Sequence, residues 1–524
     1  PPGEPFARKA WLCVSAPFRA DRLGRSLALP GIAPPIAGGA GLPPSFCHPE
    51  KLGGTLAPPV ELSIALRQAP QLEAGVKLQP SAAPNSWQNP LMQPKLLCTA
   101  VALMTTHLAS AQNADLILHN AKIATVDPQF SIRQAVAVRD GRILRTGEND
   151  EILKLRGPDT EVVDLRGRLV LPGLIDSHSH PADAAMTEFD HEIPQMADIG
   201  DVLDYIRARA RAVPAGEWIT VRQVFITRLD EQRYPTRAEL DKAAPEHPVL
   251  FATGPDASLN SLALKLSGID RDFKVTDGGS GFAEKDPQTG EPTGILRNAT
   301  RYVKVKSSNR APTQEERIQR LKALFADYNS VGITALIDRS ASENEIALFK
   351  KMREEGPLSV RVHLSRHIGT IGDLDEIQDS IRAVARDPLF TGKDATLRII
   401  GIKTFLDGGM LTGSAYMREP WGVSKIYAIT DPNYRGVRFI DHERLVPLIR
   451  AAVESGIQFT AHSVGDGAVH ALLDAYEEVN KTTPIRDTRP CISHSNFMSR
   501  ESVEKGARLG VMMDIQPPWL YHQA

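Results

Sequence analysis

Five residues with metal-binding or nucleophilic chemistry stand where extended, apolar segments of the sequence end. They are His178, His180, Lys403, His462 and His494. Two imidazoles at positions i and i+2 of an extended backbone point to the same face, so His178 and His180 can reach one metal ion. For any single histidine, a hydrogen-bonded side chain that merely finishes a strand is the alternative. Four histidines on three separate strands favour a metal site.

The elements that must position these residues alternate between strands and helices. The expected strands are 169–175, 218–224, 249–253, 333–337, 360–364, 397–404, 457–460, 490–493 and 511–515. A capping box at 313–316 opens an amphipathic helix, and Gly332 ends it before the next strand. This alternation predicts parallel βαβ units, in a TIM-type barrel or a doubly wound sheet. Since no GxGxxG motif follows the first strand and no GxxxxGK[ST] motif occurs, the sequence favours an α/β barrel, whose active sites lie at the C-terminal ends of its strands.

A small β-rich module precedes the predicted barrel. Its expected strands are 115–118, 122–126, 135–138 and 142–146, and Asp140-Gly141 supplies the residues of a tight hairpin between the last two. We therefore assign residues 112–168 to this module and 169–524 to the barrel, with an insertion at about 186–310.

The composition excludes several classes of protein. The 524 residues carry 61 Lys and Arg against 63 Asp and Glu, and this net charge of −2 argues against nucleic acid as a partner. No apolar run is long enough for a permanent membrane anchor. The 4 cysteines are far apart and lack CxxC spacing, which excludes a disulfide scaffold or a cysteine-based zinc module. The expected partner is a small-molecule substrate, and a homo-oligomer remains open.

The first part of the chain differs from the rest. Residues 1–91 hold 16 of the 39 prolines and show no sustained period, so we predict a disordered, non-native upstream extension. Met92 is followed by Lys95, an apolar run to Met104 and an Ala-Ser-Ala sequence at 109–111, the order of a secretory signal peptide. An ordinary buried helix is the alternative. We expect a signal peptide at 92–111 and a periplasmic or secreted mature protein.

Several blocks of sequence, rather than single residues, carry a family resemblance. The blocks are 170–180, Asn260-Ser261 with Ala263-Leu264, 290–296, Lys403 with Asp407-Gly408, 462–466 and Ser493-His494. Together they resemble the metal-dependent amidohydrolase superfamily, in particular its YtcJ-like branch, amidohydrolase family 3. The first block, 170–180, and the GEPTG sequence at 290–294 are the ones specific to this branch. The resemblance covers about 114–518 and implies a (β/α)8 barrel beside a small β-sandwich built from both chain ends, with a large insertion after the first barrel strand.

The resemblance also implies roles for the residues at the strand ends. It makes His178 and His180 ligands of one divalent metal ion, and His462 and His494 ligands of a second. Lys403 resembles the lysine that becomes a carbamate and bridges two metals, whereas an unmodified Lys403 paired with a carboxylate would leave a mononuclear site. Zinc is the expected ion, although histidine suits several first-row metals. The loop residues Asp407, Gly408 and Gly409 are candidates for contact with substrate, although Gly-rich turns are usually only turns.

The sequence departs from the family pattern in two places. The family's catalytic aspartate follows the eighth barrel strand, whereas 511–518 resembles the seventh. We therefore expect the general-base Asp beyond Ala524, an incomplete barrel and only the N-terminal half of the sandwich in this sequence, and we assign no catalytic role to Asp514, which lies inside its strand. The second departure is Gly254-Pro255-Asp256, where many relatives have a histidine.

The expected function is metal-dependent hydrolysis of C–N bonds in amides, cyclic amides or similar compounds, by metal-activated hydroxide. Ester or lactone hydrolysis and deamination on the same site are alternatives, because a fold does not fix a substrate. A non-catalytic or regulatory protein with a vestigial metal site is the alternative from another class.

Overall fold

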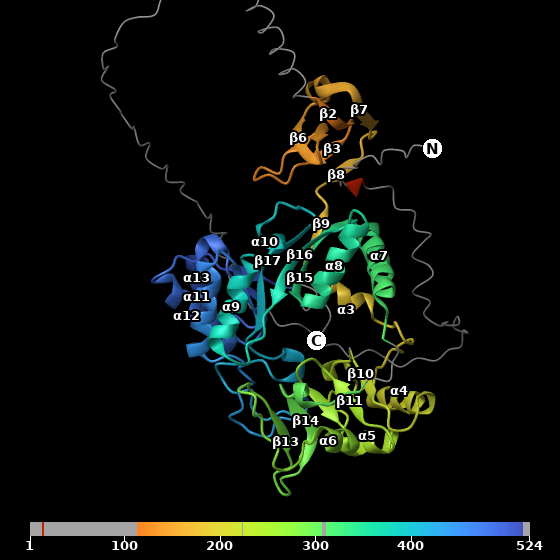
Figure 1. Ribbon diagram of the computed structural model, residues 1–524, viewed down its shortest axis with the longest axis vertical. Coiled ribbons are helices and arrows are strands. Elements are labelled where there is room, and N and C mark those ends of the chain that lie inside the picture. Colours follow the sequence, from red (N-terminus) through yellow and green to blue (C-terminus); the bar gives the residue numbers. More distant parts are fainter. Residues whose placement is uncertain (1–12, 15–112, 223, 307–310, 517–524) are drawn as a thin grey trace, which may run out of the picture. The chain divides into compact units, whose positions relative to one another are not determined.

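The computed structural model describes residues 13–14, 113–222, 224–306 and 311–516 (Figure 1). Apart from Cys13 and Val14, the predicted upstream extension and signal peptide lie outside these residues. The described chain forms two compact units that divide after Val170.

The first unit consists of two small sheets. One has the order β6 (Arg142–Gly147), β5 (Ala135–Arg139), β2 (Ala114–His119) and β7 (Arg156–Asp164), and α2 (Asn149–Ile152) and η3 (Leu153–Leu155) supply residues to its apolar core. The other has the order β1 (Cys13–Val14), β8 (Leu169–Leu171), β3 (Lys122–Ala124) and β4 (Ile132–Arg133). The predicted hairpin between β5 and β6 is confirmed, with φ of 49° at Asp140 and 71° at Gly141. The sandwich arrangement stays a prediction.

The second unit is built on a nearly closed sheet of seven parallel strands, a TIM-like barrel. In sheet order the strands are β20 (Met512–Asp514), β19 (Cys491–His494), β18 (Gln458–Ser463), β17 (Leu397–Phe405), β16 (Arg361–His367), β15 (Ile333–Ala341) and β9 (Leu174–Ser179). Because neighbouring strands are parallel, all their C-terminal ends lie on one rim. The edge strands β20 and β9 are joined by side chains, since Ser177 Oγ donates to Asp514 Oδ1 at 3.0 Å.

One predicted strand, 169–175, is wrong as a single element. It divides into β8, which belongs to the first unit's sheet, and β9, which begins the barrel. The break falls at Pro172-Gly173, where proline has no N–H to donate to a ladder. Gly173 is required for close packing, because a Cβ there would lie 2.0 Å from Thr334 Oγ1.

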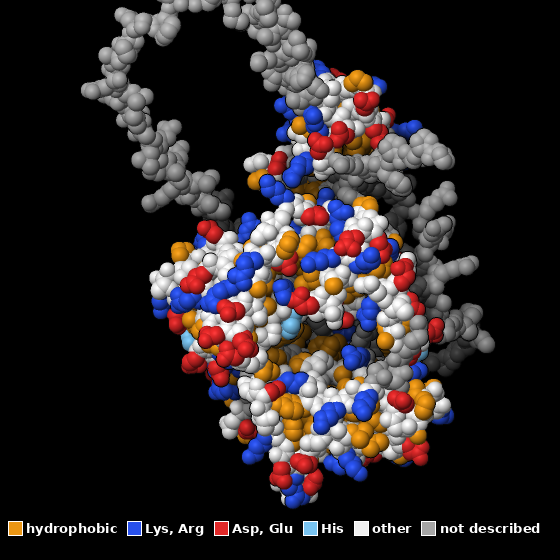
Figure 2. Space-filling view, in the orientation of Figure 1, with side chains coloured by type: hydrophobic (Ala, Val, Ile, Leu, Met, Phe, Trp, Pro, Cys, Tyr) orange, Lys and Arg blue, Asp and Glu red, His pale blue; other side chains and the backbone are white. Residues whose placement is uncertain are grey.

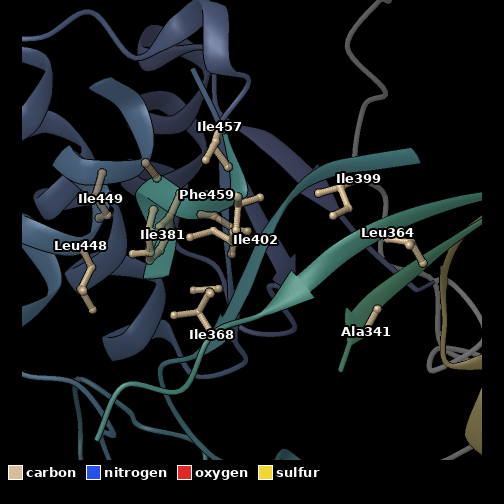
Figure 3. Packing of buried hydrophobic residues seen from close by; sticks show 14 of the residues in the cluster. Ala341, Leu364, Ile368, Ile381, Ile399, Ile402, Leu448, Ile449, Ile457 and Phe459 are labelled. Carbon is tan, nitrogen blue, oxygen red and sulfur yellow. The ribbon is translucent and has the colours of Figure 1, made fainter. Parts of the chain in front are cut away.

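Helices surround the barrel and enclose its core. They are α3 (Pro181–Ala185), α7 (Gln314–Ser330), α8 (Glu343–Glu355), α9 (Leu374–Val384), α10 (Pro388–Thr391), α11 (His442–Glu454), α12 (Asp466–Asn480) and α13 (Arg500–Leu509). The predicted capping box at Thr313 opens α7. Figure 3 shows Ile402 and Phe459 of the sheet packed near Ile381 and Ile449 of the helices. Within the described ranges, no helix has the length and apolar character needed to cross a bilayer.

The predicted insertion forms a small α/β body between α3 and α7 in the chain. Its sheet has the order β10 (Ile219–Val221), β11 (Val249–Ala252), β12 (Ala257–Leu259), β14 (Pro292–Arg297) and β13 (Phe282–Lys285). The helices α4 (Ile199–Ala212), α5 (Arg237–Ala243) and α6 (Ser261–Ser267) pack on it (Figure 1). The GEPTG block lies at the β13–β14 hairpin, and Gly294 is needed there, because a Cβ would lie 2.6 Å from Leu259 O.

Candidate metal centre

The structure brings the predicted histidines together at the rim of the barrel. The ring centroids of His178 and His494 are 4.7 Å apart, those of His462 and His494 are 4.4 Å apart, and those of His178 and His180 are 5.4 Å apart. His178 lies in β9, His462 in β18 and His494 at the end of β19, so the cluster joins strands that are distant in sequence. Lys403 lies in β17, between β16 and β18, with its Nζ 5.0 Å from the ring centroid of Phe405.

Each of the four imidazoles has one nitrogen close to a protein oxygen. The pairs are His178 Nδ1 with Asp514 Oδ2 (2.9 Å), His180 Nδ1 with Asp338 Oδ1 (3.5 Å), His494 Nδ1 with Gln516 Oε1 (2.6 Å) and His462 Nε2 with the carbonyl oxygen of Gly408 (3.3 Å). Histidines that bind metal are commonly oriented in this way through their second nitrogen. The arrangement leaves the other nitrogen of each ring for an ion.

The donor set fits a metal ion in its chemistry, but it is not arranged around one point. Among the residues that the structure describes, no group of three His, Cys, Asp or Glu side chains is positioned to hold an ion. Asp338 Oδ2 is a further possible metal ligand, because it is buried without a hydrogen-bond partner in the described part of the chain. Rotation of the clustered side chains would be required to bring three donors together.

Burial favours the neutral form of three of the clustered imidazoles, those of His178, His462 and His494. It lowers the pKa of His178, and it lowers the pKa of His494 to about 3, with the positive charge of Lys403 acting in the same direction. The pKa of His462 is lowered well below its usual value by burial and by His494. Neutral imidazole is the form that binds metal, so these environments are compatible with ligation.

Lys403 is almost completely buried, with 1% of its surface exposed. Within the described residues, no hydrogen bond or ion pair of its ammonium group is formed. Burial and the nearby charge of Arg339 lower the pKa of Lys403 to about 8. The Arg339 guanidinium itself is paired, since its Nε lies 3.1 Å from Asp514 Oδ2.

The three candidate loop residues have different environments. The buried carboxylate of Asp407 accepts hydrogen bonds from the backbone N–H groups of Tyr416 (2.9 Å), Val464 (2.9 Å) and Gly465 (2.8 Å), and burial raises its pKa to about 7. Asp407 therefore holds backbone segments together at the rim. A Cβ at Gly408 would lie 2.1 Å from Ser414 Oγ, so this glycine permits close packing. Gly409 lines the adjoining cavity.

A cavity of about 700 Å³ adjoins the histidine cluster. Barrel residues on its wall include His367, Phe405, His462 and His494, and the insertion contributes residues such as Gly254, Pro255 and Asn298. Figure 2 shows a hollow between these two parts, with hydrophobic side chains inside it. Asp256, the third residue of the departure noted in the sequence, is buried and accepts a hydrogen bond from Asn298 N–H at 2.9 Å.

Several residues at the rim were not identified from the sequence. His367 is the last residue of β16, and Asp338 lies near the end of β15, as Lys403 does in β17, so the strand-end rule that found Lys403 could have found them too. His367 Nδ1 lies 3.3 Å from Ser340 Oγ. The expectation that Asp514 lies inside its strand is wrong, because Asp514 is the last residue of β20, and its side chain contacts His178 across the gap between the sheet edges. No sequence signal gives that contact, because it depends on how the barrel closes.

The nearly closed parallel sheet and its surrounding helices place the protein among the TIM-like barrels in architecture. Residues 161–523 match the family described as "Amidohydrolase family", and the chain belongs to that family. The predicted resemblance to its YtcJ-like branch is confirmed.

Three relatives illustrate the range of the family. The chain is 29% identical over 421 residues to the N-substituted formamide deformylase of Arthrobacter pascens, covering 78% of this chain and 73% of that protein. It is 26% identical to the exoenzymes regulatory protein AepA of Pectobacterium carotovorum subsp. carotovorum (81% and 89% covered) and 26% identical to the putative amidohydrolase YtcJ of Bacillus subtilis (77% and 74%). An uncharacterized metal-dependent hydrolase from Pyrococcus furiosus shares the fold, with a TM-score of 0.50 at 21% identity and 78% of each chain covered.

Proposed function

We propose that the protein is a metal-dependent hydrolase of C–N bonds in amides, cyclic amides or similar compounds. The observation that carries this proposal is the cluster of four imidazoles, each with one nitrogen close to a protein oxygen, beside a cavity of about 700 Å³. The relatives named as a formamide deformylase and a putative amidohydrolase support the same bond type.

His178 and His180 would hold one divalent ion, and His462 and His494 a second. A divalent ion such as zinc, when bound there, would supply Lewis acidity toward a water molecule and toward the carbonyl group of the amide. The roles of the chain's own residues follow from their contacts. Asp514, Asp338 and the Gly408 carbonyl orient the imidazoles, and Asp407 fixes the loops around them.

Lys403 would supply carboxylate-like ligand oxygens after conversion to a carbamate. In this step the ammonium group first loses one proton, and the neutral Nζ then adds to the carbon of CO2 and loses a second proton, which leaves a negative carbamate. Its complete burial and its position on β17, beside the strand that carries His462, support this role.

Transfer of a proton to the leaving nitrogen needs an acid near the cluster. We propose that this group is an aspartate at the end of a barrel strand, where barrels place their catalytic residues.

Metal content measured by mass spectrometry tests the assignment of ligands. We expect His178→Ala and His462→Ala each to lower the metal content and to abolish amide hydrolysis. His191→Ala is a matched control, because His191 lies in the insertion and contacts Asp190 and Tyr205 instead. If neither His178→Ala nor His462→Ala changes the metal content, the proposed ligands are wrong.

The match to AepA, a relative named as a regulatory protein, favours a second candidate, a regulatory protein that retains the metal site. A metal-loaded full gene product that hydrolyses no compound in a panel of amides, lactones and amidines would support this candidate over the first.

We also propose that the protein is exported, on the basis of the segment from Met92 to Ala111. N-terminal sequencing of the protein from its native cells tests this point. A mature end near Gln112 is expected, and a retained 92–111 segment would contradict it.

A further inference from the structure

The cavity beside the histidines has mostly apolar walls. Large apolar side chains line it from both parts of the unit: Phe225 and Pro255 from the insertion, and Ile371, Phe405, Met410 and Phe439 from the barrel strands and loops. The hydrophobic interior of the hollow is visible in Figure 2. A ligand in this space therefore exchanges water mainly for hydrocarbon and aromatic surface.

The charged groups on the wall are already paired. Apart from histidines, Arg301 and Asp407 are the ionisable side chains among the described lining residues. The Asp407 carboxylate is occupied by three backbone N–H groups.

Arg301 uses every nitrogen of its guanidinium group. Nε donates to Asp277 Oδ2 at 2.6 Å and Nη2 donates to Asp277 Oδ1 at 3.0 Å, which forms a bidentate pair. Nη2 also donates to Ser280 O at 3.0 Å, and Nη1 donates to Asn298 O. The positive charge of Arg301 is therefore already paired with Asp277 and is not available to a carboxylate of the substrate.

From these observations we propose that the protein acts on uncharged amides that carry an apolar group, such as an aryl or branched alkyl group, and discriminates against amides that carry a carboxylate. This inference rests on the proposed function and specifies its substrate class. An apolar group gains from burial against the wall, whereas a buried carboxylate without a partner loses its hydration uncompensated.

Pairs of substrates that differ only by a carboxylate test the proposal. N-benzylacetamide is compared with N-acetylphenylglycine, which has the same skeleton with a carboxylate on the benzylic carbon, and the corresponding formyl pair controls for the size of the acyl group. We expect kcat/KM of the metal-loaded protein to favour the neutral member of a pair by at least about 100-fold, because a buried group left unpaired is strongly rejected. N-methylacetamide should be slower than N-benzylacetamide, by about fourfold for each methylene equivalent of lost burial.

Two variants locate the discrimination in the cavity. Asp277→Asn leaves Arg301 without its counter-charge, so kcat/KM for the carboxylated member should rise at least about tenfold while the neutral member changes little. Asp286→Asn is the matched control, since Asp286 accepts hydrogen bonds within a turn of the same insertion and is absent from the cavity wall. Ile371→Ala should reduce kcat/KM for benzyl amides but not for N-methylacetamide, with the exposed Val503→Ala on α13 as its control.

Titration calorimetry with the same pairs separates this proposal from the proposed function. If no amide is hydrolysed but N-benzylacetamide binds and N-acetylphenylglycine does not, the substrate class holds and the hydrolase assignment fails. If the wild-type protein hydrolyses or binds the carboxylated member as well as the neutral one, or binds neither, the inference is overturned.

Discussion

Two fully buried cations in the second unit differ in the hydrogen-bond and ion-pair partners that surround them. Arg297, at the end of β14 in the insertion, is surrounded by acceptors: its Nη1 donates to Thr412 O at 2.7 Å, its Nη2 donates to Tyr427 O, and its Nε donates to Glu284 Oε1 at 3.1 Å. Lys403, in β17 of the barrel, is equally buried, and none of the described residues forms an ion pair with it. The insertion satisfies its buried charge, whereas the barrel rim does not.

The difference distinguishes a structural group from a functional one. A buried charge is retained when partners compensate for its lost hydration, and Arg297 has such partners from the insertion and from the loop after β17. Lys403 has no hydrogen-bond or ion-pair partner among the described residues, so its burial departs from this rule. Residues that break such rules of stability are concentrated at functional sites. The comparison can be tested by removing each cation in turn.

Arg297→Met should have the largest effect on stability. It leaves the buried Asp256 and the partly buried Glu284 without their counter-charge, so the free energy of unfolding should fall by about 3–5 kcal/mol. Urea denaturation followed by circular dichroism measures this change. A decrease in the free energy of unfolding of less than about 1 kcal/mol would show that the partners of Arg297 stabilise the fold no more than an exposed ion pair does.

Lys403→Met should leave stability unchanged or raise it, because an apolar side chain replaces an unpaired buried cation. Amide hydrolysis should nevertheless fall at least about 100-fold and the metal content should fall, since the variant cannot form a carbamate. The same denaturation experiment and metal analysis measure both quantities. A strongly destabilised variant would mean that Lys403 has a structural role and that the contrast with Arg297 is wrong.

Asp514→Asn sharpens the comparison inside the barrel. Asp514 holds His178 Nδ1 at 2.9 Å, so loss of its charge should weaken metal binding by about 10–100-fold. Because Asp514 also pairs with the buried Arg339, the free energy of unfolding should fall as well. Competition with a chelator measures the affinity. Asp474→Asn is the control, because Asp474 pairs with Lys505 on the surface; equal effects from both variants would remove Asp514 from the site.

Glu239→Gln should have the smallest effect. The Arg233–Glu239 pair is part-exposed at 2.8 Å, and Arg233 and the Thr236 cap of α5 lower the pKa of Glu239 to about 2. Since the folded-state pKa is depressed, this stabilisation is present above the pKa of the unfolded chain and is lost as the pH falls toward 2. We expect a loss of about 1 kcal/mol at pH 6 and a smaller one at pH 3, measured by urea denaturation. A loss that grows as the pH falls would reverse the sign of this linkage.

The sequence alone predicted the features that depend on local pattern. Parallel strands end on one rim, so polar residues that close apolar strands were sufficient to identify His178, His462 and His494 as neighbours. Contacts that depend on tertiary closure were not predictable in this way: Asp514 reaches His178 only because β20 and β9 approach each other. The three backbone bonds that occupy Asp407 were likewise hidden, because they come from two separate loops.

The position of the insertion has a consequence for how the chain folds. Leu174 in β9 pairs with Ile333 in β15, so the strand that carries His178 joins its neighbour only after the whole insertion has been accommodated between them. Closing so long a loop lowers the entropy of the chain before the contacts between the two strands can form, and this slows folding. The insertion has apolar clusters of its own, and early collapse around them would bring its two ends close and shorten the effective loop. The rate at which the histidine cluster assembles should therefore depend on residues such as Phe251 and Leu240, which belong to an apolar cluster of the insertion and not to the histidine cluster.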